Sequence, residues 1–302
     1  MGFLLLSQAG ILGCSSPSYD TSTTVANSLK ISNSIAIVNQ SLSSGNCAAA
    51  LAEISPLYTS VSTNNDIRFA TANTYACSAG VNIMQIFSDL ISFGDLSGSM
   101  FWKFLVQEFP SVASPDDKKP LSAELGMDAL FAMTRSGIII GTSDQVNASG
   151  RNPGSILVTD RTNQANSYLT FLSMALMGSL LDRYGAPDAS HVKTSNLPWT
   201  TPAATVGDGC SFVSGLLNFY DSLPYILGAS SSTSVQSAYQ SIDSFLSLGL
   251  DTACSAGCTL CGLSCTSCPR TLRNRDSCTG QNSDANSCAA AGVTAFVNAG
   301  WT

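Results

Sequence analysis

Seven cysteines gather near the C-terminal end of this 302-residue chain, and their side chains are the ones most suited to chemistry. The first five follow one another at intervals of four, three, four and three residues, which on a continuous helix would place every sulfur atom on one face. The seven are Cys254, Cys258, Cys261, Cys265, Cys268, Cys278 and Cys288. Metal or iron–sulfur ligation, thiol–disulfide catalysis and structural cross-linking all use such clusters.

The metal interpretation rests on spacing. The first three cysteines have the C-x3-C-x2-C spacing of the radical-SAM triad, and two C-x2-C pairs overlap in the same run. Radical-SAM enzymes usually carry the triad early in a barrel with an aromatic residue beside the last cysteine, where this chain has Leu260. Paired C-x2-C zinc sites need a spacer of about 15–20 residues, which these adjoining pairs lack. The sequence therefore predicts neither a metal nor a cofactor.

Structural disulfides are the remaining interpretation, because catalytic C-x2-C motifs accompany a βαβ pattern that this sequence does not show. Cysteines three or four apart on a helix have Cβ atoms about 5–6 Å apart, whereas a disulfide requires about 3.8 Å. Either the segment is irregular, which Gly257 and Gly262 permit, or its sulfurs reach outward to Cys210, Cys278 and Cys288. Both alternatives predict a cross-linked C-terminal cap.

An isolated cysteine ends the motif Ile11-Leu12-Gly13-Cys14, behind the apolar run Phe3-Leu4-Leu5-Leu6. This motif resembles a lipobox, at which a bacterial signal peptidase cuts before the cysteine that carries the lipid. The resemblance implies a lipoprotein with palmitate-type chains on Cys14, and Ser15 implies the outer membrane. A signal peptide requires a positively charged start, but no Lys or Arg precedes the motif in this chain. A start codon assigned too late would explain the missing charge. A buried N-terminal segment is the alternative, but the polar tether Ser15-Ser16-Pro17-Ser18 favours the anchor.

Composition agrees with an exported protein. The chain has 11 cysteines, so lipidation of Cys14 leaves an even number, as expected in an oxidising compartment. Charged residues make up 11% and the net charge is −7, which predicts no nucleic-acid partner. The nearest approach to a basic cluster, Arg270, Arg273 and Arg275, is interpreted as a solvated patch. The stretch from Tyr168 to Leu181 is too short and too interrupted to span a membrane.

Hydrophobic spacing of three and four residues predicts an all-α fold of antiparallel helical hairpins with a disulfide-rich C-terminal cap. Two short isoleucine-rich runs, 138–140 and 156–158, are the candidates for extended segments. The predicted organisation is a signal segment (1–13), a tether (14–24), a helical domain (25–250) and the cysteine-rich cap (251–302). Predicted helices begin near 25 and include 48–57, one running from 67 through 87, 100–109, 121–133, 160–185, 209–223 and 234–248.

The segment from Gly45 to Gly80 resembles a degenerate tetratricopeptide unit. Gly45, Ala50, Ala72 and Tyr75 occupy the small-residue and tyrosine positions of that repeat, although a tryptophan in the opening position and a clear second copy are missing. The resemblance implies two antiparallel helices closed by small residues.

Cys47 and Cys77 lie at equal distances from the centre of the turn expected near residue 62. At about 1.5 Å of rise per residue, antiparallel helices bring both cysteines to the same height. We therefore predict a disulfide between them. The alternative is two unpaired buried cysteines that act as small apolar residues.

His191 is the chain's one histidine, and it lies between Gly185 and Ala204 in a predicted connector, close to Asp188 and Ser190. Neighbours in sequence seldom form a catalytic triad, and the sequence lacks the G-x-S-x-G turn. We interpret His191 as an exposed loop residue and predict no catalytic residue and no enzyme.

The sequence therefore predicts a lipid-anchored bacterial cell-envelope protein that faces the periplasm or the cell surface. It would act as a helical scaffold, adaptor or binding module for a protein or peptide partner, since helical-hairpin arrays offer concave surfaces. The alternative is a periplasmic enzyme or small-molecule receptor with a pocket between helix pairs near residues 185–204.

Overall fold

The computed structural model describes residues 23–61, 64–94, 96–111, 118–131, 133, 161–229 and 232–302. These residues form ten α-helices and three short 3-10 helices and contain no β-strand, so the predicted all-α class is confirmed. The motif that resembles a lipobox, with Cys14, lies outside the described residues, as do the two isoleucine-rich runs.

Short segments separate α1 through α5 and also α9 from α10, whereas longer ones precede α6, α8, α9 and α11. Their bounds are α1 Thr23–Ser43, α2 Cys47–Ser60, α3 Asn65–Ser78, α4 Ile83–Phe93, α5 Ser99–Glu108, α6 Lys119–Phe131, α8 Asn163–Gly185, α9 Asp208–Ala229, α10 Thr233–Leu260 and α11 Ala285–Gly300. The 3-10 helices are η1 Pro202–Ala204, η2 Arg270–Arg273 and η3 Arg275–Ser277.

Small polar side chains start most of these helices. Such residues accept hydrogen bonds from backbone N–H groups that lack partners in the first turn. At α8 this role belongs to Thr162, which accepts a hydrogen bond from the N–H of Ala165, so the predicted start at Asp160 is too early. The other side-chain caps are Asn46, Asn64, Asn82, Ser232 and Asp284.

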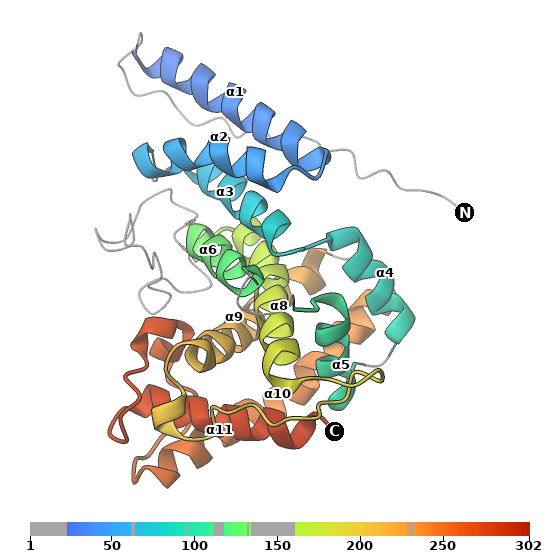
Figure 1. Cartoon of the computed structure of the whole chain (residues 1–302), viewed down its shortest axis with the longest axis vertical. Coiled ribbons are helices and arrows are strands. Elements are labelled where there is room, and N and C mark those ends of the chain that lie inside the picture. The colour runs from blue at the N-terminus through green and yellow to red at the C-terminus, as the bar shows by residue number, and fades with distance from the viewer. Residues whose placement is uncertain are drawn as a thin grey trace.

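Helix α8 forms the centre of the molecule. Every residue from 169 to 181 is buried, as expected of a helix that is covered on all sides. It packs against α5, α6 and α9, and Figure 1 shows these helices around it. The main core cluster extends from α3 to the last residues of α11. A second, smaller cluster joins α1, α2 and α3.

The helix predicted to run from residue 67 through 87 is in fact two helices. Helix α3 ends at Ser78, α4 begins at Ile83, and the two are bent by 61°. Gly80 has a φ of +81°, which breaks a helix, and Asn82 caps the next one by accepting the N–H of Gln85. A left-handed glycine followed by an asparagine cap overrides the apolar spacing here.

Helix α10 is longer than predicted, because it continues beyond residue 248 to Leu260. Gly249 and Gly257 do not end it. Each lies where α11 approaches closely: a Cβ on Gly249 would meet the Phe296 ring at 2.4 Å. The helix stops just before Gly262, whose φ is +74°.

Two consequences concern the organisation of the chain. Helix α10 crosses residue 250 without a break, so the predicted boundary between helical domain and cap does not coincide with the end of an element. Within the described residues, no single helix is long and apolar enough to cross a membrane; the bent pair α3–α4 meets that criterion only when taken together.

Among the described glycines, the two at the crossing of α10 and α11 leave the least room for a side chain. A Cβ on Gly257 would lie 2.1 Å from the carbonyl oxygen of Cys288, and one on Gly292 would lie 2.0 Å from that of Ala253. No side chain fits at either position without moving a backbone.

Gly292→Ala is expected to lower the free energy of unfolding by about 1–3 kcal/mol, because its methyl group forces α10 and α11 apart. Gly300→Ala on the same helix is the matched control, since its Cβ would lie 3.5 Å from Trp102 Nε1, an ordinary contact distance. Urea unfolding followed by circular dichroism measures both. Equal stability of the two variants would contradict the close crossing.

Candidate functional site

Five disulfides join ten cysteines of the chain. Cys47 and Cys77 are bonded with Cα atoms 5.6 Å apart, which is the pairing predicted from the hairpin geometry. The bond links the first residue of α2 to the last turn of α3. The other pairs are Cys210–Cys278, Cys254–Cys268, Cys258–Cys265 and Cys261–Cys288.

The crowded cysteine run combines both alternatives that its spacing allowed. Cys254 and Cys258 lie on regular helix, and the chain then turns back after Gly262. The returning segment places Cys265 beside Cys258 and Cys268 beside Cys254, with Cα–Cα distances of 5.9 and 5.0 Å. The two nested bonds clamp the end of α10.

The two remaining bonds connect this clamp to other elements. Cys261 is bonded to Cys288 on α11, and Cys210 on α9 is bonded to Cys278 after η3. A cysteine binds a metal ion as its thiolate, and a sulfur in a disulfide is not a thiolate. Among the described residues no group of three or more His, Cys, Asp or Glu side chains has an arrangement that would hold a metal ion.

His191 lies in the connector between α8 and α9, where its backbone carbonyl takes part in a hydrogen bond. It is half-buried rather than exposed, has a φ of 58°, and its carbonyl accepts a hydrogen bond from Trp301 Nε1 at 3.0 Å. The Oδ1 atom of Asp188 accepts the backbone N–H groups of Ser190 and Val192 at 2.8 and 3.0 Å. Asp188 therefore shapes the turn.

The connector is bound to α11 where the alternative interpretation expected a pocket. Asn298 accepts the N–H of Leu197 at 2.8 Å and donates to its carbonyl at 3.0 Å. Trp199 is 4% exposed and packs on Tyr184 and Phe212. Buried aromatic side chains thus fill the inner side of this segment.

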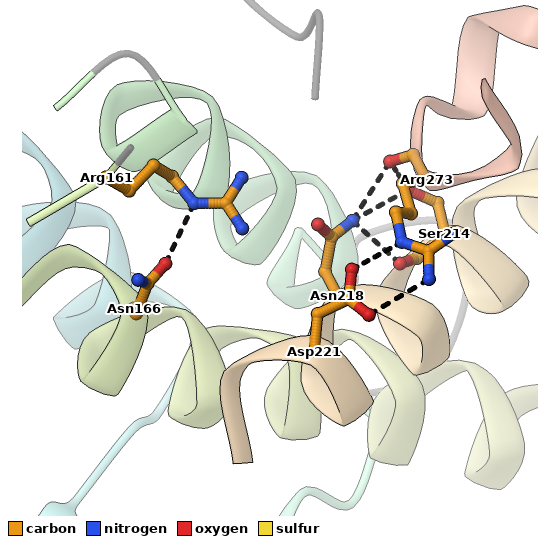
Figure 2. Close-up of polar contacts among 6 residues, drawn as sticks. All are labelled: Arg161, Asn166, Ser214, Asn218, Asp221 and Arg273. Atoms are coloured by element: carbon orange, nitrogen blue, oxygen red, sulfur yellow. Dashed lines mark hydrogen bonds and ion pairs between the residues drawn. The ribbon is translucent and has the colours of Figure 1, made fainter. Parts of the chain in front are cut away.

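A polar network lies inside the helical body, on α9 and η2 (Figure 2). Arg273 forms a two-point ion pair with Asp221, including Nη2 to Oδ1 at 2.9 Å, and the side chains are 14% and 15% exposed. Asn218 donates to the Arg273 carbonyl at 2.9 Å, and Ser214 donates to the same oxygen. The network attaches η2 to α9.

Arg161 lies apart from this pair in Figure 2 and is 1% exposed. Its Nε donates to Asn166 at 2.8 Å, and its guanidinium lies 5.7 Å from the centre of the Phe131 ring. Burial lowers the pKa of Arg161 to about 10, and the charge of Asp221 opposes that effect. Asp221 thus acts on two arginines.

The prediction of a solvated arginine patch is wrong for Arg273 and Arg275. The Arg275 side chain is 24% exposed and pairs with Glu124, whose side chain is 7% exposed, and with Asp276 at 3.2 Å. The ion pairs of Arg273 with Asp221 and of Arg275 with Glu124 could not be predicted from the sequence. In each pair the carboxylate lies far from its arginine along the chain. One usable signal was the polar residues Asn218 and Asp221 beside the buried apolar residues Leu216, Leu217 and Phe219.

A cavity of about 440 Å³ adjoins the start of α9, close to the end of the connector. Its charged groups contact other side chains of the chain: Arg275 pairs with Glu124 and Asp276. Asp208 accepts a hydrogen bond from the Tyr184 hydroxyl at 2.5 Å and lies 3.7 Å from Arg183. Its charged lining residues are Glu124, Asp208, Arg275 and Asp276. Each charged group that lines this cavity therefore contacts another polar or charged side chain of the chain.

One carboxyl group has a strongly perturbed titration. Burial, then the charge of Asp89 and a hydrogen bond to it, raises the pKa of Glu108 to about 7. Gln85 donates to the same Asp89 carboxylate. The pair joins α4 to α5, on helices that sequence reasoning did not bring together.

No protein-family model, curated protein or solved structure matches this chain. Its function must therefore be argued from its own residues.

Asp221→Asn is expected to lower the free energy of unfolding by about 2–4 kcal/mol, because it removes the negative charge that balances Arg273 and favours the charged form of Arg161. Arg273→Met should cost less in the Asp221→Asn background than in the unmodified chain, since the pair is already broken. A double-mutant cycle from urea unfolding measures this coupling. Strictly additive losses would show that the two side chains do not interact.

The Glu108 carboxyl predicts a pH dependence of stability. Because its pKa is raised in the folded state, the Glu108 carboxyl holds its proton more tightly there than in the unfolded chain. In the unfolded chain a glutamate has a pKa of about 4.3. The contribution of Glu108 to the free energy of unfolding is therefore fully present below a pH of about 4.3. It is lost as the pH rises through about 7.

Glu108→Gln should remove that pH dependence, and Asp89→Asn should lower the pKa of Glu108 toward its ordinary value. Unfolding at a series of pH values, with NMR titration of the Glu108 carboxyl, provides the measurement. A Glu108 titration near about 4.3 in the folded chain would contradict the interaction.

Proposed function

We propose that this chain is a lipid-anchored protein of the bacterial cell envelope that acts as a helical scaffold, adaptor or binding module. One observation carries the proposal. The five disulfides take up ten of the 11 cysteines, and the remaining cysteine is Cys14, the one that ends the lipobox motif. Cross-linking on this scale requires an oxidising compartment, and a lipobox belongs to a signal peptide, which directs export to one.

The surface of α10 supports binding to a protein or peptide rather than catalysis. Two open grooves follow its outer side, and hydroxyl and amide side chains with an exposed Leu248 or Leu260 line most of both. The acidic residue in their lining is Asp251, in the groove that includes Leu260. Such grooves offer hydrogen bonds and apolar contacts without a paired acid and base.

The alternative, a periplasmic enzyme or small-molecule receptor with a pocket near residues 185–204, stays a prediction. The filled connector and the internally paired charges beside it favour the scaffold. The proposed location is the outer membrane, with the folded body toward the periplasm or the cell surface.

Cys14→Ala is expected to release the protein from membranes or leave it unprocessed in a bacterial host, because no acyl chain can then be attached. Membrane fractionation and intact-mass analysis provide the measurement. Leu248→Ala is the control and should stay in the membrane fraction. A mature unsubstituted protein that is free of membranes and carries no lipid on Cys14 would overturn the proposal.

A further inference from the structure

Helix α1 has an inner face that packs on the body and an outer face toward solvent. Val38 is fully buried against α2 and α3, while Leu29 and Ile37 on the outer side are 59% and 47% exposed. Figure 1 shows α1 as the outermost helix, at one end of the longest axis. The other exposed residues of this face include Asn33, Ala36 and Gln40.

Charge distinguishes this face from the exposed apolar residues of α4 and α10. Lys30 is the one charged residue in α1, although the whole chain has a net charge of −7. Met84 shares α4 with Asp89, and Leu248 shares α10 with acidic residues. Anionic lipid surfaces attract lysine and repel carboxylates. Of these three helices, α1 therefore suits such a surface best.

The position of α1 in the chain gives a second argument. Thr23 follows Cys14 by nine residues, and a fully extended chain spans at most about 3.3–3.6 Å per residue. A lipid on Cys14 thus keeps the start of α1 within about 30 Å of the bilayer. The tether makes contact between α1 and the membrane intramolecular, which raises its effective concentration to the order of millimolar. A few exposed apolar side chains can then orient a body that the anchor already holds.

We propose that the outer face of α1 rests on an anionic phospholipid bilayer, with Leu29 and Ile37 in the interfacial region and Lys30 at the phosphate groups. This inference rests on the proposed function, because it requires the lipid on Cys14. It directs the disulfide-rich cap, at the opposite end of the longest axis in Figure 1, away from the membrane.

Tryptophan fluorescence tests the orientation, because Trp102, Trp199 and Trp301 are at most 4% exposed and are shielded from lipid. Leu29→Trp is introduced into the lipidated full-length mature protein, which is reconstituted into vesicles of phosphatidylglycerol and phosphatidylcholine with brominated acyl chains. The expected result is a loss of fluorescence from the introduced indole relative to unbrominated vesicles, with a shift of its emission to shorter wavelength. Leu248→Trp, at a side chain that is 81% exposed on α10, is the matched control and should show neither change.

Two further variants sharpen the test. Adding Lys30→Glu or Ile37→Glu to the Leu29→Trp protein should reduce the quenching at position 29 while the anchor keeps the protein on the vesicles. Neither side chain is buried in the core, so circular dichroism should show an unchanged fold.

The outcomes separate the two proposals. Vesicle-bound protein without quenching at position 29, or with equal quenching at position 248, would overturn the orientation and leave the anchor intact. Stronger quenching of Met84→Trp would assign the membrane face to α4 and also overturn this inference. Failure of the lipidated chain to associate with vesicles would overturn the proposed function and the orientation together.

Discussion

Helices α10 and α11 approach so closely that only glycine fits at their crossing, and much of the C-terminal half depends on this contact. Gly257 and Gly292 face the opposite backbone there, and the Cys261–Cys288 bond lies about one turn away on each helix. From the far end of α11, Trp301 reaches back to the carbonyl of His191. A displaced α11 would therefore disturb both the disulfide clamp and the connector.

The low charge content decides how the remaining polar groups are satisfied. Many serine and threonine hydroxyls donate to a carbonyl three or four residues earlier in their own helix, as Ser179 does to Ala175 at 2.7 Å. Such bonds let hydroxyl groups enter a helical core without an external partner. The few ions are used differently: Arg273 with Asp221 and Arg275 with Glu124 join η2 and η3 to helices of the body. The pairs thus attach η2 to α9 and η3 to α6.

The helices and the first disulfide were predictable because local patterns determine them. Apolar spacing located most of the helices, although it merged α3 with α4 and did not predict α11. The symmetric positions of Cys47 and Cys77 about one turn were enough to pair them. Glycine was the main source of error. Gly80 ends a helix and Gly257 continues one, yet a sequence does not show whether a glycine adopts a positive φ or accepts a neighbouring helix. The ion pairs could not be predicted from the sequence, because their partners lie on α6, α9 and the cap and meet only in the folded chain.

One cross-link supports the smaller of the two hydrophobic clusters. The cluster between α1, α2 and α3 has few buried apolar residues, and the Cys47–Cys77 bond closes a 30-residue loop beside it. Closing such a loop lowers the chain entropy of the unfolded state, which contributes about 3–4 kcal/mol to the free energy of unfolding. Cys47 also follows the turn after α1, so the bond connects that turn directly to the end of α3. Helix α3 also packs against α6 and contributes Ala72 and Ala76 to the main core, so the bond ties the small cluster to the rest of the molecule.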